Sequence, residues 1–398
     1  MRSSTAPATL TVSRVSTPES FAALTPDWDG LVRAMRRPSP FLQHSWLTEW
    51  WRHYGERGEL AVFVARRDGR LVGALPLCLL PRCGLTVLTF IGDRDSVLAD
   101  LLISADESPR VAAALVERAL ETGRDFVDLY GLPQSNHLMD SLDPSRLHFI
   151  QRAEAPVLDL EDTWDAVYTA RTSSKARSLH RRRRRQLAEL GRVETDVARN
   201  EEELARALED AFVLHDLRWD GRPDGSRFTT ETGKHFHRAA IRALAQSDVA
   251  RIMTLKLNGR PIAFNYFFTF AGRMYGHRLA FDPAFGRVSP GLINTFDAIA
   301  LATDEGATRI EFLGGPERYK VDLADRFEPM YEAIGLAATA PGAAAVAGRV
   351  GVIRARRFLK RSPALRRFYF DGLAPTRRLL GRAGGRRRRD AAAGRATG

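Results

Sequence analysis

The sequence of 398 residues contains only two cysteines, Cys78 and Cys83, and no long apolar run. Two cysteines cannot build a disulfide scaffold, and without a second pair they do not form a zinc site. We therefore expect reduced thiols in a cytoplasmic protein. No stretch reaches the roughly 18 consecutive apolar residues of a membrane-spanning helix, and the N-terminus has no apolar core of signal-peptide length. Because His235 and His237 lack a third ligand at a suitable spacing, no metal is predicted.

Lysine is scarce too, at five of the 60 basic residues, and the excess positive charge is confined to one end of the chain. Residues 338–398 contain 16 basic and two acidic residues, a net charge of +14, whereas the whole chain carries +12. Residues 1–337 are left at −2, so the charge gives no indication that the body binds nucleic acid.

The basic C-terminal tail, residues 338–398, also carries apolar anchors. Val346, Val350 and Ile353 have the spacing of an amphipathic helix, and aromatic residues precede the run Arg386–Arg389. Arginine with aromatics suits an anionic membrane surface or a nucleic acid. A solubilising tail without a partner is the alternative. We expect a cytoplasmic protein whose tail can attach it to the inner membrane face.

The body contains an internal repeat. Residues 59–77 and 249–268 each have the pattern of apolar strand, turn and apolar strand, around Asp68-Gly69 and Asn258-Gly259. Such dipeptides are a strong signal for a β-hairpin. A second pair of segments shares glycines and a proline at an offset of 183 residues: Gly123, Gly131 and Pro133 correspond to Gly306, Gly314 and Pro316.

Helix and strand patterns surround this second match in both copies. Residues 111–120 and 292–302 have helical apolar spacing, and residues 125–130 and 308–313 alternate as strands do. The shared order of hairpin, strand, helix and strand predicts an α/β fold with mixed sheets, built as two duplicated domains over residues 10–165 and 166–337. Residues 155–160 are expected to cross between them.

The loop after the strand predicted at residues 273–283 has the features of a helix start. Ser289 at the N-cap and Pro290 at the first helical position favour a helix, and Gly286 and Gly291 flank them. Free backbone N–H groups and the positive helix end would suit a pyrophosphate, and Arg287 adds charge. The alternative is a helix start that binds nothing.

Taken together, these elements resemble the GNAT acyltransferases, and within them the CelD-type cellulose-biosynthesis family, relatives of the FemAB aminoacyl transferases with two GNAT-like halves. The resemblance covers roughly residues 40–325. It rests on five motifs: Trp46–Trp51, Ser174–Gly191, Phe281-Asp282-Pro283, Ser289-Pro290-Gly291 and Glu311–Lys320. In that family Ser-Pro-Gly stands where other GNAT proteins have the loop Q/R-x-x-G-x-G/A.

The resemblance implies an N-acyltransferase that moves an acetyl or other acyl group from acyl-CoA to an amine, or a hydroxyl, of a sugar- or lipid-linked envelope or polysaccharide precursor. The implied acyl-CoA site is Gly286, Arg287, Ser289, Pro290, Gly291 and Leu292. The equivalent Gly92–Asp100 lacks the second glycine, so only the second domain should bind acyl-CoA. Two alternatives stay open: a FemAB-type transferase using aminoacyl-tRNA, the only nucleic acid expected, and a non-catalytic module that binds anionic ligands.

Four residues are candidates for catalysis. His277 in the predicted strand has an ordinary pKa near 6.5 that suits a base, and Asp282 follows that strand. Tyr319 could protonate a leaving thiolate and Lys320 could stabilise an oxyanion. Structural roles in a core, a turn or a charged loop are the alternatives.

Acceptor-binding candidates come from three places. Lys175 and Arg177 begin a helix predicted over residues 174–192, which with Arg171 carries nine basic residues and suits an anionic acceptor. Arg218 and Trp219 could line a sugar-sized cleft, and Glu317 precedes the catalytic candidates. A solvated helix and a core tryptophan are the alternatives.

Overall fold

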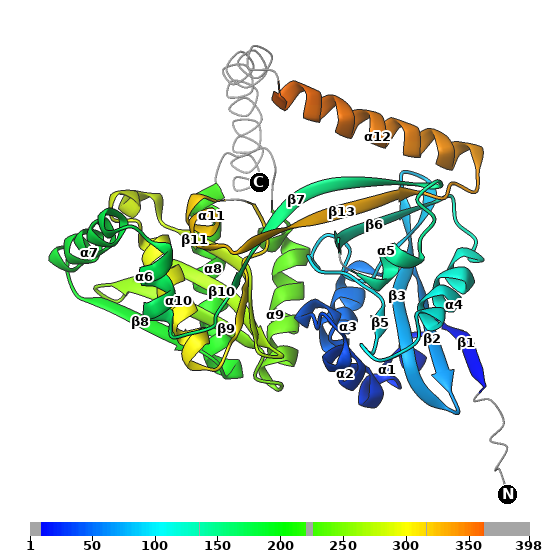
Figure 1. Ribbon diagram of the computed structural model, residues 1–398, viewed down its shortest axis with the longest axis horizontal. Coiled ribbons are helices and arrows are strands. Elements are labelled where there is room, and N and C mark those ends of the chain that lie inside the picture. Colours follow the sequence, from blue (N-terminus) through cyan, green and yellow to red (C-terminus); the bar gives the residue numbers. More distant parts are fainter. Residues whose placement is uncertain (1–8, 135, 220–225, 316, 362–398) are drawn as a thin grey trace, which may run out of the picture. The chain divides into compact units, whose positions relative to one another are not determined.

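The computed structural model describes residues 9–134, 136–219, 226–315 and 317–361. The chain divides into two compact units, Met1–Thr339 and Ala340–Gly398 (Figure 1). The first unit holds both copies of the repeat, and the second unit begins with helix α12 (Ala340–Arg361).

Among the described residues, the first copy contains thirteen elements, one of them a short extra strand. In chain order these are β1 (Leu10–Val15), α1 (Pro18–Ala22), α2 (Thr25–Ala34), the 3-10 helix η1 (Pro40–Leu42), α3 (His44–Tyr54), β2 (Glu59–Arg67), β3 (Arg70–Arg82), β4 (Leu85–Phe90), the extra strand β5 (Leu102–Ile103), α4 (Pro109–Leu120), β6 (Phe126–Pro133), α5 (His137–Ser141) and β7 (Leu147–Asp159).

The second copy begins with two additional helices and then follows the same plan. Its elements are α6 (Trp164–Arg171), α7 (Ser174–Glu189), β8 (Val193–Ala198), α8 (Glu201–Trp219), the 3-10 helix η2 (Arg227–Thr229), α9 (Glu231–Ala245), β9 (Ala250–Leu257), β10 (Arg260–Phe270), β11 (Arg273–Phe281), the 3-10 helix η3 (Pro283–Val288), α10 (Pro290–Asp304), β12 (Arg309–Glu311), α11 (Arg318–Leu323) and β13 (Arg326–Gly335).

The predicted hairpins are both present and equivalent. Strands β2 and β3 pair antiparallel around Asp68-Gly69, and β9 and β10 pair antiparallel around Asn258-Gly259. All four turn residues have φ between +49° and +81°, the left-handed backbone that this type of two-residue turn requires. The shared order of hairpin, strand, helix and strand confirms the predicted mixed α/β fold built from two duplicated halves.

The two halves share one sheet because they exchange their last strands. The strand order is β1-β2-β3-β4-β6-β13-β7-β12-β11-β10-β9-β8. Strand β7 of the first copy pairs with β12 of the second, whereas β13 of the second copy pairs with β6 of the first. The exchanged strands also pair with each other, from Arg326 opposite Val157 to Gly335 opposite Leu147. The crossing segment predicted at residues 155–160 is the end of β7.

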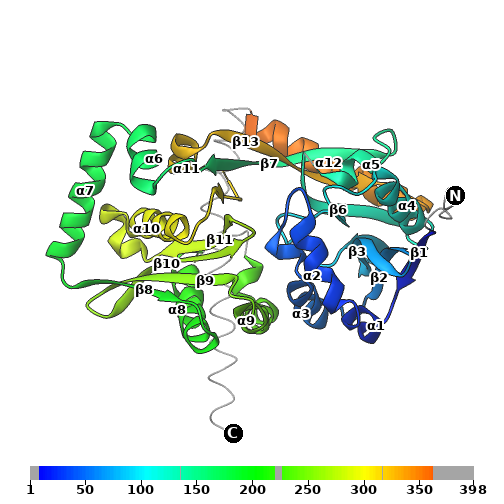
Figure 2. The ribbon, with the colours of Figure 1, turned by 60° about the horizontal axis from the view of Figure 1, so that its bottom comes forward.

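Helices cover both faces of each half. In the second copy α8 and α9 lie on one face of the strands and α10, with α6 and α7, on the other (Figure 2). Helix α3 packs against α9, so the largest apolar core runs from the first helices of one copy into the other, through Trp28 and Trp46 to Phe236 and Tyr266. In helix α7 only Leu187 is buried, and Leu190 at its C-terminal end is 53% exposed.

The second unit is described only through α12. This helix contains Val346, Val350 and Ile353, as their spacing predicts. The aromatic residues 368–370 and the run Arg386–Arg389 lie outside the described residues.

Candidate active site

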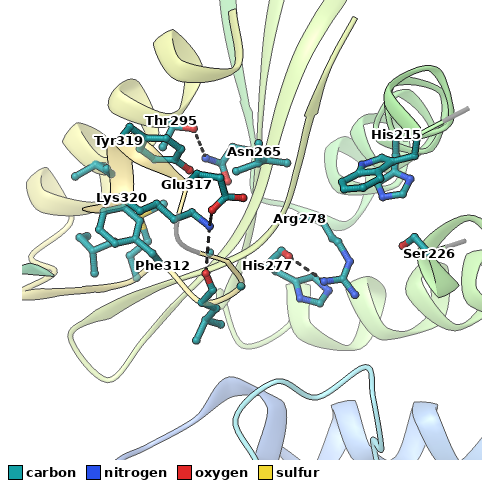
Figure 3. A pocket seen from close by; sticks show the side chains of 18 of the residues that line it. His215, Ser226, Asn265, His277, Arg278, Thr295, Phe312, Glu317, Tyr319 and Lys320 are labelled. Carbon is teal, nitrogen blue, oxygen red and sulfur yellow. Dashed lines mark hydrogen bonds and ion pairs between the residues drawn. The ribbon is translucent and has the colours of Figure 1, made fainter. Parts of the chain in front are cut away.

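The second copy opens between β11 and β12. These strands pair in parallel only from Arg273 opposite Arg309 to Tyr275 opposite Glu311. Strand β12 then ends, whereas β11 continues to Phe281. The edge of β11 beyond Tyr275 therefore has no partner strand in the described sheet. A cavity of about 570 Å³ lies at this opening, lined by residues of β10, β11, α8, α10 and α11 and by Arg94 and Asp95 of the first copy (Figure 3).

A bulge in β11 shapes the wall of the cavity. In the pairing of β10 with β11, Tyr266 lies opposite Arg278 and Phe267 lies opposite Gly276, which leaves His277 as an extra residue. Bulges redirect the side chains around them. His277 and Arg278 are neighbours in the chain, yet both line the cavity.

His277 lies in an aromatic surrounding that keeps it neutral. Its ring lies 5.0–5.6 Å from five other rings, those of Phe41, Trp46, His237, Tyr266 and Phe268. Neither of its ring nitrogens has a hydrogen-bond partner among the described residues. Burial lowers the pKa of His277 well below its ordinary value, and the charge of Arg278 lowers it further. A neutral imidazole can accept a proton, but this one is a weak base.

Tyr319, Lys320 and Glu317 meet at the other wall, on and just before α11. The Lys320 ammonium donates to the Leu313 carbonyl at 3.1 Å and forms an ion pair with Glu317 at 2.8 Å. Burial raises the pKa of Tyr319, and the negative charge of Glu317 raises it further. The phenol therefore stays protonated at neutral pH and can act as a proton donor.

Two polar residues that the sequence did not indicate complete this wall. The amide of Asn265 donates to the Thr295 hydroxyl at 3.5 Å, and that hydroxyl donates to the Gly291 carbonyl at 2.8 Å. Both side chains are buried. They connect the cavity to the first turn of α10.

The predicted pyrophosphate loop does not present a row of free N–H groups. The amides of Ala284 and Phe285 donate to Asp282, and that of Ser289 donates to Gly286. The amides of Leu292 and Ile293 both donate to the Ser289 carbonyl. Ser289 is the N-cap residue of α10, but it has φ 51° and ψ 56° and its side chain makes no capping hydrogen bond. A phosphate bound at this loop would therefore meet several amides that already donate within the loop.

The loop residues also lie apart from the cavity. None of Gly286, Arg287, Ser289, Pro290, Gly291 and Leu292 lines it. A Cβ added at Gly291 would meet the Phe281 ring at 2.9 Å, so the packing of this ring explains the glycine. At Gly286 the nearest atom is 3.9 Å from an added Cβ, and Arg287 is exposed.

The remaining predicted residues divide between the cavity and the surface. Trp219 lines the cavity, and Arg218 lies over the Phe281 ring at 5.0 Å. Asp282 lies outside the cavity, where it caps η3 and pairs with Arg260 at 2.5 Å. Lys175 is exposed. Arg177 donates to the carbonyls of Thr169 and Thr172, and thereby closes the turn between α6 and α7.

In the first copy the corresponding region is filled by its own chain. The loop between β4 and β5 lies along β6, where Ala99 donates to the Gly131 carbonyl at 2.9 Å. The buried indoles of Trp46 and Trp50 hold this loop through Ser96 and Asp95, at 3.0 and 2.9 Å. These two tryptophans are core residues.

No group of three or more His, Cys, Asp or Glu side chains is placed to hold a metal ion within residues 9–361, the few undescribed positions apart. No described helix is long and apolar enough to cross a membrane.

Comparison with known proteins points to one fold. The structure is similar to that of FemX, with 12% identity and a TM-score of 0.57, over 81% of this chain and 96% of that one. It is also similar to the C-terminal domain of a putative lysylphosphatidylglycerol synthetase from Agrobacterium fabrum, with 13% identity, a TM-score of 0.51, and 83% and 96% of the two chains covered.

A third similar structure is a conserved protein of unknown function from Bacteroides thetaiotaomicron, with 12% identity, a TM-score of 0.51, and 82% and 100% covered. No curated protein sequence matches significantly. Residues 174–321 match the family model described as an acetyltransferase (GNAT) domain. This range includes α7 through most of α11, and therefore both walls of the cavity in the second copy. The chain thus has a mixed α/β GNAT-like fold, and its residues 174–321 are similar to a GNAT acetyltransferase domain.

Proposed function

We propose that the second copy transfers an acyl group from acyl-CoA to an amine or hydroxyl of a sugar- or lipid-linked envelope precursor, as in the CelD-type family. The observation that carries the proposal is the opening between β11 and β12, with an unpaired strand edge and a cavity of about 570 Å³ inside the GNAT domain. An extended acyl arm can add to a free strand edge through main-chain hydrogen bonds, which orients the acyl carbon.

Side chains that line the cavity then transfer the protons of the reaction and stabilise its developing charge. The acceptor nitrogen attacks the acyl carbon, and the bond from that carbon to the sulfur breaks. His277 is the candidate that accepts the proton from the acceptor, because both of its ring nitrogens are without partners in the described structure. Tyr319 donates its proton to the leaving thiolate. Lys320, held by Glu317, stabilises the negative charge on the acyl oxygen.

A second donor, aminoacyl-tRNA, is favoured by two observations. The amides of four residues of the loop donate within it, those of Ala284, Phe285, Ser289 and Leu292, so a pyrophosphate bound to them would have to displace existing hydrogen bonds. The similar structures with TM-scores above 0.5 include FemX and a putative lysylphosphatidylglycerol synthetase domain. In both versions the chemistry stays in the second copy, within the domain that we place at residues 166–337, because the first copy fills its own opening.

The donor is tested by incubating the full chain separately with acetyl-CoA, longer acyl-CoAs and aminoacyl-tRNA, each with a panel of amino sugars. An acyl-CoA near 100 times its Kd should stabilise the fold by about 2.7 kcal/mol, and turnover should release free thiol. Tyr319→Phe should lower kcat about 100-fold. Tyr168→Phe is the matched control, because the Tyr168 hydroxyl bonds to His180 and does not line the cavity.

The outcomes separate the alternatives. Binding and turnover with acyl-CoA support the first donor, whereas transfer only from aminoacyl-tRNA supports the second. Absence of transfer from either donor would reject an enzymatic role and favour a binding module.

A further inference from the structure

We propose that Arg278 binds an anionic group of the acceptor, a carboxylate or a phosphate, inside the cavity. The inference rests on the proposed acyl transfer and names a chemical property of its acceptor. Two observations support it: the ion pairs formed by the charged side chains of the cavity wall, and the position of Arg278 next to His277.

Among the described residues, four arginine and lysine side chains line the cavity. Three of them form ion pairs with acidic side chains. Arg94 pairs with Glu332 at 2.7 Å, Arg227 with Asp95 at 3.1 Å, and Lys320 with Glu317 at 2.8 Å. Arg278 forms no ion pair with any described carboxylate. Among the described residues, the cavity therefore contains one positive charge, that of Arg278, without an ion-pair partner.

The surroundings of Arg278 leave most of its donors free. One N–H donates to the His277 carbonyl at 3.0 Å, and Nε has no hydrogen-bond partner among the described residues. The guanidinium carbon lies 6.0 Å from the ring centroid of Phe228. The nearest acid, Asp95, already accepts from Trp50 and Arg227. Burial lowers the pKa of Arg278, which is the expected effect of a charge taken out of water without a partner.

An anionic ligand would offset this cost. A guanidinium presents parallel N–H groups that match a carboxylate or phosphate in a two-point contact. His215 adds a ring nitrogen, Nδ1, that has no described partner, and Ser226 lies on the same wall. Because Arg278 follows His277 directly, an acceptor held through its anion at Arg278 brings its amine close to the imidazole that we propose as the proton acceptor.

The test uses three small amines that differ in one group: glycine, glycinamide and 2-aminoethyl phosphate, at constant ionic strength. Thermal unfolding of the full chain should show a saturable rise in Tm with glycine, with aminoethyl phosphate, or with both, and none with glycinamide, which has no anionic group. The arm that responds distinguishes a carboxylate from a phosphate. In Arg278→Gln the apparent Kd should rise at least about tenfold, because hydrogen bonds to charged groups contribute about 1.5–3 kcal/mol.

The matched control is Arg242→Gln, an exposed arginine on α9 that does not line the cavity. It should respond to the probes as the wild type does. Without probes, Arg278→Gln should be at least as stable as the wild type, since a buried charge without a partner is removed. Equal shifts with all three probes, no shift with any, or an unchanged Kd in Arg278→Gln would overturn the inference. None of these measurements needs an acyl donor, so anion binding can fail or succeed separately from acyl transfer.

Discussion

Three histidines of the second copy are buried near the cavity and stay neutral when the protein is folded. Burial lowers the pKa of His237 and His277 well below the ordinary value, and lowers that of His215 to about 4. In the unfolded chain each histidine titrates near 6.5. The unfolded state therefore binds more protons below that pH, and stability falls as the pH drops.

The direction of this pH dependence gives a measurable prediction for His237→Phe. The free energy of unfolding in urea should fall between pH 7.5 and 5.0 in the wild type, and the fall should be about 2 kcal/mol smaller in the variant, because one buried histidine gives up to about 1.4 kcal/mol per pH unit below 6.5. His235→Gln, at an exposed neighbouring position, should keep the wild-type dependence. Equal pH dependence in all three proteins would contradict the argument.

An added side chain should destabilise the protein at Gly291 but not at Gly286, although both glycines lie near the start of α10. Gly291→Val places a methyl group against the Phe281 ring, which already lies 2.9 Å from a Cβ at this position. We expect a loss of about 1–3 kcal/mol in stability, as in overpacked cores. Gly286→Ala meets nothing closer than 3.9 Å and should melt like the wild type. Equal melting temperatures for the two variants would show that the Phe281 contact is unimportant.

The sequence identified part of the site through local patterns. Five predicted residues do line one cavity: Trp219, His277, Glu317, Tyr319 and Lys320. Arg278 was missed because a bulge, which depends on the pairing of β10 with β11, turns it to the same cavity as His277. The predicted loop residues were chosen for helix-start chemistry; they precede or begin α10 but do not line this cavity, and their role in binding stays a prediction.

The exchanged strands explain why element prediction succeeded while the sheet order was not foreseen. Hairpins at Asp68-Gly69 and Asn258-Gly259 are specified by adjacent residues, and the structure has both. The pairing of β13 with β6 joins residues about 200 positions apart, and alternating apolar patterns do not specify such a distant partner.

Breaking the central exchanged strand should destabilise both copies at once. Ala333 of β13 is buried and pairs with Leu129 of β6 and Phe149 of β7. Proline here removes an N–H from the ladder and distorts its neighbours, which we expect to cost on the order of 3 kcal/mol. Hydrogen exchange should accelerate in β6 and β7 together. Ser13→Pro in the edge strand β1 should affect only β1 and β2, and a similarly local effect of Ala333→Pro would contradict shared stability.

The compact body should function without the basic tail. We placed the boundary at residue 337, but Ala338 and Thr339 both bond to Asp125, at 2.8 and 2.5 Å, and the first unit ends at Thr339. Truncation after Thr339 should therefore keep the melting temperature and any turnover on a soluble acceptor. Binding to anionic vesicles should weaken, by about 1 kcal/mol per arginine near the surface, and should fade with salt. A joint collapse of melting temperature and turnover would place part of the tail inside the body.

The strand exchange also determines how long part of the sheet stays incomplete while the chain is synthesised on the ribosome. Strand β6 ends at Pro133, but its neighbour β13 ends at Gly335. The edge of β6 that pairs with β13 therefore stays unpaired until about 200 further residues have been synthesised. At about 5–20 residues per second, this wait is on the order of 10–40 seconds. During that time β6 presents an unpaired edge, which is the kind of surface that recruits other strands. The nascent chain must therefore be shielded until its last strand emerges, and a slower ribosome would lengthen the exposure.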